Sequence, residues 1–130
     1  MYKRQGIISA TVNGMTDLYL ISTRRDRIRR LTYDLWDDVD PSFVPGTNSI
    51  VFSSNRLTDT LNVKTKDVTL VDNNYNLFFY NLDTTINVVN RITNTVSKDI
   101  QPFALNDQEI IYLSDQKGIY NIFKLSLIHI

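Results

Sequence analysis

Asp17-Leu18-Tyr19-Leu20 is the first of three related segments in this chain; the others are Asn76-Leu77-Phe78-Phe79 and Asn121-Ile122-Phe123-Lys124. The second and third segments begin 45 residues apart, which is the length of a repeat that contains four β-strands. The first and second begin 59 residues apart, so 14 additional residues lie between them. This spacing predicts a series of similar β-sheet units.

Two further pairs of segments repeat in the same order. Leu31-Thr32 returns as Ile92-Thr93. Pro41-Ser42-Phe43, followed by Ile50-Val51-Phe52-Ser53-Ser54, returns as Pro102-Phe103, followed by Ile110-Ile111-Tyr112-Leu113-Ser114. This alignment makes Phe43 and Phe103 equivalent.

Short aromatic and β-branched runs, separated by Asn, Asp, Gly and Pro, predict strands rather than helices. The expected strands are 7–12, 18–22, 27–31, 41–44, 49–54, 76–81, 86–92, 103–105, 109–114 and 119–124. Asn13-Gly14 predicts a tight hairpin turn. Pro41 and Pro102 are expected at the first position of a strand, where a missing N–H costs no ladder bond.

The fold class expected is therefore all-β, with antiparallel four-stranded sheets. Alternation of apolar residues predicts which side chains are packed. They are Ile50, Phe52, Leu77, Phe79, Ile110, Tyr112 and Ile122.

Composition excludes several classes of function. The chain has 14 basic and 14 acidic residues, so it has no strong positive electrostatic potential that would favour the binding of nucleic acid. No apolar run approaches the ~18 residues of a membrane-spanning helix. There is no Cys, and the single His is His129. We therefore expect no catalytic residue, no cofactor and no metal site, and neither Ser53-Ser54 nor Ser114 lies in a nucleophile motif.

The two ends have an unusual sequence. One reading frame of the transposase end sequence used in sequencing libraries encodes Leu125-Ser126-Leu127-Ile128-His129-Ile130. The reverse complement of that sequence, read from a GTG start codon, encodes Met1-Tyr2-Lys3-Arg4-Gln5. We therefore expect residues 1–5 and 125–130 to be adapter-derived tails that make no essential contacts, except that Leu125 and Ser126 extend the last strand. Residues 6–124 are then expected to be a piece of a longer protein.

Nearly all of residues 6–124 resembles the TolB-like, WD-repeat-like β-propeller family, and the first copy carries the specific match. Its matching segments are Leu31-Thr32, Asp38, Asp40-Pro41-Ser42-Phe43, Val44-Pro45-Gly46 and Ile50-Val51-Phe52-Ser53-Ser54-Asn55-Arg56. The later copy departs from the pattern, because Asn106-Asp107 replaces the Pro-Gly turn and Gln101 replaces the Asp before Pro.

The resemblance implies a partial β-propeller. Residues 6–31 would end one blade, 41–93 would form a complete blade with an insertion at 56–75, and 101–124 would form most of a third. A closed ring needs at least four blades, so the rest of its own propeller would be required for closure.

The family also implies a function: a non-catalytic module of a bacterial cell-envelope protein, periplasmic or at the cell surface, that binds a protein or peptide. The alternative is the propeller of a larger prolyl-oligopeptidase-like peptidase whose catalytic domain lies elsewhere. A propeller lyase or sugar-binding enzyme is a third possibility. Fold alone does not choose among them.

Three groups of polar or aromatic residues allow two interpretations each. Asp34, Asp37, Asp38 and Asp40 fit either a Ca²⁺ site or Asx turns. The basic residues Arg24, Arg25, Arg27, Arg29 and Arg30 fit either the binding of nucleic acid or an acidic partner, or the protection of an outer strand from edge-to-edge pairing. Trp36 fits either an interaction anchor or a cover for the end of a sheet.

The loops 33–40 and 56–75 are expected to emerge at the same end of one sheet, because neighbouring strands of a meander alternate in direction. A long insertion on a rigid scaffold is a common recognition element. The candidate partner contacts are Trp36, Asp37, Asp38, Arg56, Lys64, Lys66 and Asp67. The alternative is an insertion without a partner, since loop length costs little free energy.

Overall fold

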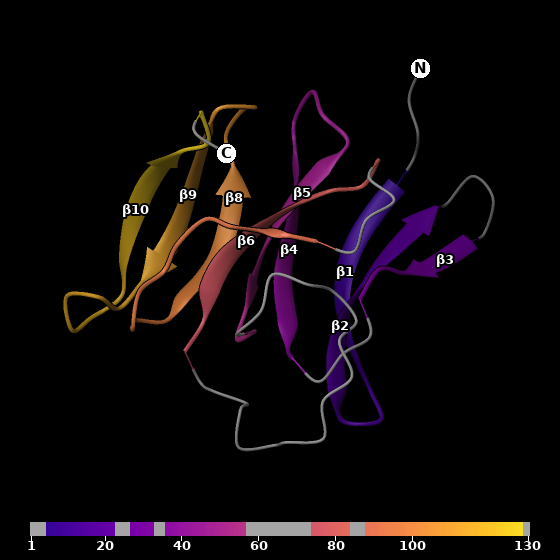
Figure 1. Cartoon of the computed structure of the whole chain (residues 1–130), viewed down its shortest axis with the longest axis horizontal. Helices are drawn as coiled ribbons and strands as arrows, with labels where there is room; N and C mark the ends of the chain where they lie inside the picture. The colour runs from indigo at the N-terminus through magenta and orange to yellow at the C-terminus, as the bar shows by residue number, and fades with distance from the viewer. Residues whose placement is uncertain (1–4, 23–26, 33–35, 57–73, 84–87, 129–130) are drawn as a thin grey trace.

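The structure, a computed structural model, describes residues 5–22, 27–32, 36–56, 74–83 and 88–128 (Figure 1). Its regular elements are ten strands: β1 (Gln5–Val12), β2 (Met15–Ser22), β3 (Arg27–Arg30), β4 (Asp38–Val44), β5 (Ser49–Ser54), β6 (Asn76–Asn81), β7 (Asn90–Arg91), β8 (Asp99–Ala104), β9 (Glu109–Ser114) and β10 (Asn121–Ser126). No helix occurs within these ranges, so none there could cross a membrane. The expected all-β class is confirmed.

The strands form three antiparallel meanders. The first sheet has the order β1-β2-β3, the middle sheet β4-β5-β6-β7 and the third sheet β8-β9-β10. The middle sheet has the expected four strands, although β7 contains only two residues. The first and third sheets have three strands each within the described ranges.

The hairpin between β1 and β2 has the predicted turn. Val12 pairs with Met15, so Asn13 and Gly14 alone connect the strands. Both have positive φ, 54° and 79°. This is the left-handed conformation that a two-residue hairpin needs and that Asn and Gly adopt most easily.

The three sheets stack face to face (Figure 1). Strand β4 packs against β1 and β2 on one side and against β8 on the other. The first core cluster fills the space between the first and middle sheets, and its buried members are Leu18, Leu31, Ile50, Phe52, Phe78, Tyr80, Leu82 and Val89. The second fills the space between the middle and third sheets, and its buried members are Val44, Val51, Leu77, Ala104, Ile110, Tyr112 and Leu127.

Strand β5 shows why the sequence folds in this way. All six of its residues are buried. Ile50 and Phe52 belong to the first cluster, whereas Val51 belongs to the second. Successive side chains of a strand point to opposite faces, so a continuous apolar run serves two cores at once.

Both prolines lie at β-bulges inside strands, and not at the first position of a strand as the sequence suggested. Asp40 and Gln101, which precede Pro41 and Pro102, have φ of 53° and 51°. The register shifts between Val39 and Ser42, and again at the equivalent place in β8. A bulge tolerates Pro because its residues leave the ladder.

The strand register also corrects the equivalence of Phe43 and Phe103. Phe43 pairs with Ile50, whereas Phe103 pairs with Ile111, one residue later in its strand. The structural equivalent of Phe43 is therefore Ala104, which pairs with Ile110. Phe103 instead lies on the outer face of the third sheet, where it is 57% exposed.

The expected packing is confirmed for six of the seven residues and is wrong for Ile122, which is 72% exposed. The expectation for the C-terminal residues is also wrong in part. Strand β10 extends through Ser126 as expected. However, Leu127 is buried in the second cluster, and Leu125 packs against it.

Candidate functional site

A threonine clamp occurs twice, at equivalent places in the first and middle sheets. The Thr32 hydroxyl accepts a hydrogen bond from the Leu18 N–H at 3.0 Å and donates to Asp17 Oδ1 at 3.3 Å. Leu31 N–H donates to the Leu18 carbonyl at 2.8 Å. We call this arrangement the threonine clamp: the hydroxyl of Thr32 and the N–H of Leu31 both bind the backbone of Leu18 on the neighbouring strand.

The second clamp has the same contacts. The Thr93 hydroxyl accepts from the Leu77 N–H at 2.9 Å and donates to Asn76 Oδ1 at 3.2 Å. Ile92 N–H donates to the Leu77 carbonyl at 2.8 Å. The repeated pairs of segments in the sequence thus correspond to one repeated hydrogen-bonding unit.

An arginine two residues before each threonine adds a contact with an aromatic ring. The Arg30 guanidinium lies 5.9 Å from the centre of the Tyr19 ring, and that of Arg91 lies 4.7 Å from the Phe78 ring. Each arginine is also the register partner of its aromatic residue. A cation over a ring face is stabilised by the ring quadrupole.

The third sheet has, on an edge strand, residues equivalent to those that the clamp contacts in the middle sheet. Asn121, Ile122 and Phe123 on β10 take the places of Asn76, Leu77 and Phe78. Phe123 stacks on Tyr112 at 5.9 Å, as Phe78 stacks on Phe52 at 5.8 Å. Strand β10 is the last strand of its sheet, and no described residue takes the place of Thr32 or Thr93 beside it. We call Asn121, Ile122 and Phe123 the open receptor.

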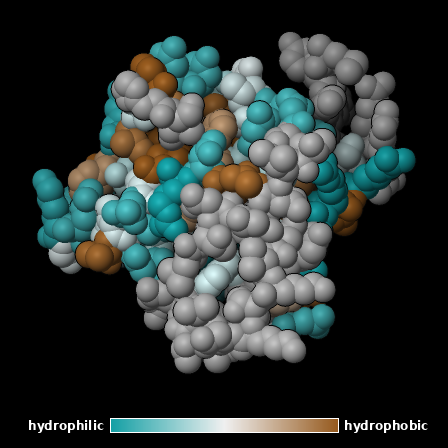
Figure 2. All heavy atoms as spheres, viewed as in Figure 1, coloured by the Kyte–Doolittle hydropathy of each residue, from teal (hydrophilic) through white to brown (hydrophobic). Residues whose placement is uncertain are grey.

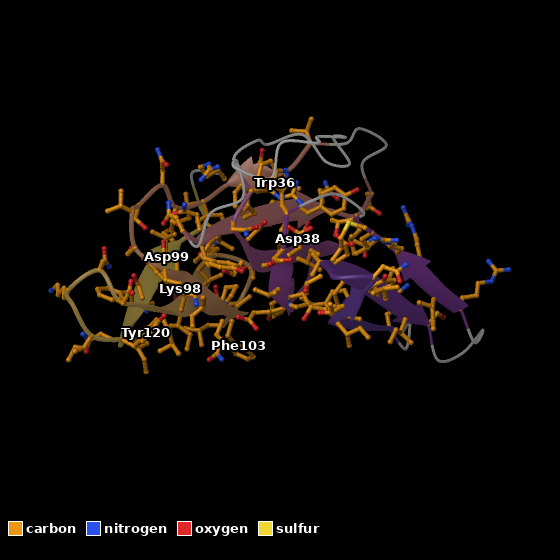
Figure 3. All side chains as sticks on the ribbon, turned by 90° about the horizontal axis from the view of Figure 1, so that it is seen from below. Trp36, Asp38, Lys98, Asp99, Phe103 and Tyr120 are labelled. Carbon is orange, nitrogen blue, oxygen red and sulfur yellow. The ribbon has the colours of Figure 1, made fainter. Side chains whose placement is uncertain are left out.

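An exposed apolar face adjoins the open receptor. Phe103 (57% exposed), Leu105 (46%) and Ile122 (72%) belong to this outer face of the third sheet, beside the partly buried Ile111 and Leu113. Figure 2 shows hydrophobic atoms among polar ones over this sheet, on the left of the view. In Figure 3, Phe103 lies at the side of the molecule opposite Trp36.

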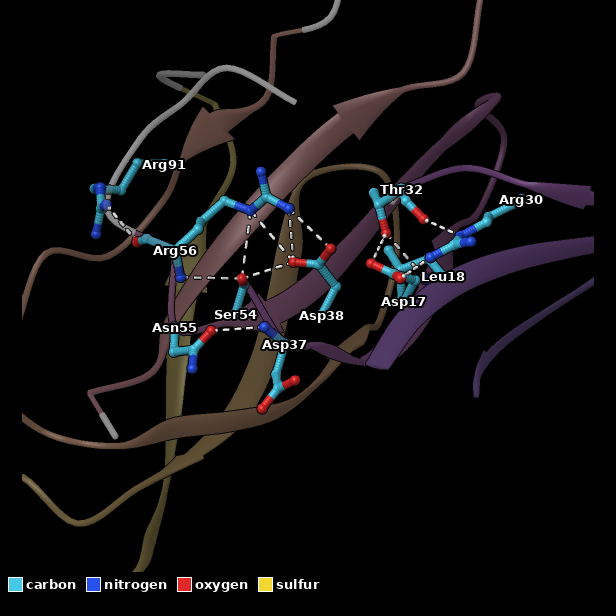
Figure 4. Close-up of polar contacts among 10 residues, drawn as sticks. All are labelled: Asp17, Leu18, Arg30, Thr32, Asp37, Asp38, Ser54, Asn55, Arg56 and Arg91. Atoms are coloured by element: carbon cyan, nitrogen blue, oxygen red, sulfur yellow. Dashed lines mark hydrogen bonds and ion pairs between the residues drawn. The ribbon is translucent and has the colours of Figure 1, made fainter. Parts of the chain in front are cut away.

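A buried ion pair joins the start of β4 to the end of β5 (Figure 4). Arg56 Nη2 donates to both carboxylate oxygens of Asp38 at 2.8 Å, and neither side chain is exposed. Ser54 Oγ donates to the same carboxylate at 2.7 Å and accepts from the Arg56 N–H at 3.1 Å. The carboxylate is thus satisfied by partners from its own sheet.

Asp99 occupies the equivalent place in the third sheet with different partners. Ser114 Oγ donates to Asp99 Oδ1 at 2.6 Å, as Ser54 does to Asp38. Hydroxyls of Thr95 and Ser97 donate to the carboxylate at 2.9 and 3.1 Å. Gln116 occupies the position that Arg56 has in the middle sheet, so the hydroxyls of Thr95 and Ser97 replace the guanidinium as donors to the carboxylate.

Three of the four described residues that were expected to contact a partner are internal. Trp36, Asp38 and Arg56 are 3%, 0% and 1% exposed, so their side chains belong to the interior. The Trp36 Nε1–H meets no acceptor among the described residues. Asp37 is partly exposed, and Lys64, Lys66 and Asp67 lie outside the described residues.

The described ends of loops 33–40 and 56–75 meet as expected. Asp37 N–H donates to Asn55 Oδ1 at 2.7 Å. Burial raises the pKa of the Tyr75 hydroxyl, and the nearby Asp37 carboxylate, which accepts its hydrogen bond, raises that pKa further. The two loops therefore begin at one end of the middle sheet.

The acidic residues near β4 serve the backbone and the ion pair. Asp40 Oδ2 accepts a hydrogen bond from the Gln101 N–H at 3.1 Å, which joins the bulges of β4 and β8. Within the described part of the chain, no group of three or more His, Cys, Asp or Glu side chains is placed to hold a metal ion. Asp34 lies outside that part, as do Arg24 and Arg25 of the basic run.

Among the described residues of the basic run, Arg30 makes the internal contacts. Arg27 and Arg29 are exposed on the edge strand β3, whereas Arg30 forms an ion pair with the buried carboxylate of Asp17. Burial raises the pKa of Asp17, and the hydrogen bond from Arg30 opposes this rise.

Sequence reasoning missed two features of the site. The Asp38–Arg56 pair was placed on a loop surface, although Asp38 and Asp99 repeat together with Ser54 and Ser114. The arginine of the clamp was missed as well, although it stands in both Arg30-Leu31-Thr32 and Arg91-Ile92-Thr93. Both features have a signal in the sequence, because their polar residues return at the same spacing from the repeated apolar segments.

No family model matches this chain, and no curated protein shows significant sequence similarity to it.

Proposed function

We propose that this chain is part of a β-propeller of the TolB-like, WD-repeat-like kind and acts as a non-catalytic, protein-binding scaffold of a bacterial cell-envelope protein. The arrangement of the sheets supports the propeller. Consecutive meanders stack face to face, and the clamp and the buried acid recur at equivalent positions. Propeller blades have this meander order.

The observation that carries the binding role is the outer face of the third sheet. Its residues Phe103 and Ile122 are more than half exposed. The equivalent residues of the middle sheet, Val51 and Leu77, are fully buried against the third sheet. An exposed apolar face that has a buried counterpart is a surface for association, with the next sheet of a longer propeller or with another protein.

Capture of proteins from a bacterial envelope extract tests the binding role. The immobilised chain is compared with a variant that carries Phe103→Asp and Ile122→Lys, and with the control Val96→Asp. Val96 is fully exposed and lies outside this face. We expect the parent and the control to capture the same envelope proteins and the double variant to lose them. Equal capture by all three would contradict the proposal.

The loop 56–75 is tested in parallel. A version without residues 58–73 is compared with the parent in the same extract. Loss of partners from this version alone would assign recognition to the loop tip at Lys64, Lys66 and Asp67, and away from the third sheet.

A further inference from the structure

We propose that the buried carboxylate of Asp99 binds an alkali cation, Na⁺ or K⁺, together with the side-chain hydroxyls that surround it. These hydroxyls belong to Thr95, Ser97 and Ser114. The inference goes beyond the protein-binding role and does not depend on it. It is carried by a comparison of two equivalent acids, Asp38 and Asp99, which lie on neighbouring sheets (Figure 3).

The two acids have the same place in the backbone. Asp99 pairs across the strands with Ser114, as Asp38 does with the serine at the end of β5. Each serine hydroxyl donates to its acid, at 2.6 and 2.7 Å respectively. Each also accepts the backbone N–H of the residue two positions later, at 3.1 Å for Arg56 and 3.3 Å for Gln116. Gln116 is therefore the backbone equivalent of Arg56.

The two acids differ in how their charge is compensated. The buried guanidinium of Arg56 neutralises the Asp38 carboxylate (Figure 4). Asp99 is only 1% exposed, yet among the described residues no Lys or Arg side chain forms an ion pair with it. The ammonium of the neighbouring Lys98 lies over the Tyr75 ring, 5.3 Å from its centre. Buried charges in proteins are paired or coordinate a metal ion, so the third sheet needs a cation from another source.

The hydroxyls around Asp99 have too few protons for their contacts. Thr95 Oγ1 lies 2.6 Å from Ser97 Oγ, and these two oxygens lie 2.9 and 3.1 Å from the carboxylate oxygens of Asp99. The three contacts need three protons, but the two hydroxyls supply two and an ionised carboxylate supplies none. Ser114 uses its own proton on the same carboxylate. A bound cation removes this shortage, because each oxygen can then direct a lone pair toward it.

The chemistry of the cluster suits a hard cation of single charge. All of its side-chain ligands are oxygens, which hard cations prefer. Asp99 supplies one negative charge, so a cation of charge +1 balances it as the Arg56 guanidinium balances Asp38. Thr95 and Ser97 are partly exposed, so water can reach the cluster and complete the coordination.

A cation at Asp99 would hold three segments together. The Asp99 N–H donates to the Tyr75 carbonyl at 2.9 Å, just before β6. Ser53 Oγ on β5 donates to the Asp99 carbonyl at 2.6 Å, and Ser114 on β9 holds the carboxylate. Binding of the cation should therefore stabilise the contact between the middle and third sheets.

The test measures thermal unfolding of the full chain in NaCl, KCl or choline chloride at the same ionic strength. Choline is too large for the cluster and controls for electrostatic screening. We expect an unfolding midpoint about 3 °C or more higher in NaCl or KCl, because a ligand that binds only the folded state stabilises it. In the ¹⁵N-labelled chain, the same salt should produce saturable shifts of the Thr95, Ser97 and Gln116 amide signals, and choline chloride should not.

Variants of the chain identify the site. Gln116→Arg supplies the guanidinium that the third sheet lacks, at a position that is exposed and tolerates substitution. It should raise the midpoint in choline chloride and abolish the difference between the salts. Asp99→Asn should abolish the difference and the amide shifts, because it removes the charge. Asp107→Asn on an exposed turn is the matched control and should retain both.

Equal midpoints of the parent chain in the three salts would overturn the proposal, and so would the absence of saturable amide shifts. A difference between the salts that persists in Asp99→Asn or in Gln116→Arg would place the cation elsewhere and overturn it as well. Greater stabilisation by CaCl₂ than by NaCl or KCl at the same ionic strength would contradict a singly charged ligand. None of these results bears on the capture of envelope proteins, so the proposed function stands or falls separately.

Discussion

Arg56 donates to both carboxylate oxygens of Asp38 at 2.8 Å, with both side chains fully buried. The pair joins the first residue of β4 to the segment directly after β5, across the strand pairing that the bulge at Asp40 interrupts. A buried charge that loses its partner is strongly destabilising. An intact buried pair contributes little net stability, because the cost of desolvating both charges offsets their attraction.

Arg56→Met should lower the free energy of unfolding by about 3–5 kcal/mol, because it leaves the Asp38 carboxylate buried without its cation. Urea unfolding followed by Trp36 fluorescence measures the change. Adding Asp38→Asn to the same chain should recover part of the loss, since an amide carries no charge to desolvate. Arg29→Met on the exposed edge strand is the control and should stay within about 0.5 kcal/mol of the parent.

Thr93→Val keeps the shape of the side chain and removes its hydroxyl. The buried Leu77 N–H and the Asn76 side chain then lose a partner, and we expect a loss of about 1–3 kcal/mol. Thr32→Val should behave alike, because its contacts are the same. Thr11→Val removes only an exposed hydroxyl contact with Thr16, so a similar loss there would contradict the role of the clamp.

Leu77 and Ile122 occupy equivalent places on their sheets but differ in burial, at 0% and 72% exposed. Leu77→Ala should cost about 2–5 kcal/mol, because it opens a cavity in the second cluster. Ile122→Ala should cost less than about 1 kcal/mol, since little of its surface is buried. Chemical unfolding of the two variants side by side measures the difference, and equal losses would show that the outer face is covered.

Asp17→Asn should remove a pH-dependent contribution to stability. The pKa of Asp17 is raised in the folded chain, mainly by burial. The folded state therefore binds the proton of the Asp17 carboxyl more tightly than the unfolded state does. As the pH rises above 3.8, the ordinary pKa of an Asp carboxyl, the ionisation of Asp17 opposes folding. The stability of the variant relative to the parent should increase between about pH 4 and pH 7.

Thermal unfolding across this pH range checks the prediction, with Asp107→Asn on an exposed turn as the reference. A difference between Asp17→Asn and the parent that does not vary with pH would show that Arg30 fully offsets the burial of this carboxylate.

The sequence predicted all ten strands because their apolar periodicity and the turn residues between them are local signals. Asn13-Gly14 is the clearest case, since the turn geometry requires these residues. The error at Phe103 arose because the aromatic residue lies two positions after Pro41 but only one position after Pro102. The bulges of β4 and β8 have the same register shift, so Phe103 is equivalent to Ser42 and points to the opposite face from Phe43.

The error at Ile122 has a different cause. Alternation shows which side chains share a face, but not whether another sheet covers that face. The misplacement of Arg56 and Trp36 arose because polar and aromatic residues near a turn usually lie at the surface. The repeat of Asp38 and Ser54 as Asp99 and Ser114 marks the buried acid in the sequence, but Arg56 itself does not recur, and only the structure places it against Asp38.

The middle sheet contributes side chains to both core clusters, and as a consequence the stability against local opening differs between the three sheets. Loss of β5 would open both clusters, because Ile50 and Phe52 belong to one and Val51 to the other. Fraying of β1 or β10 would expose only one cluster, as in linear arrays stabilised by nearest neighbours. Amide hydrogen exchange should therefore be slowest in β5 and progressively faster toward β1 and β10, so that the chain melts from its two outer sheets inward.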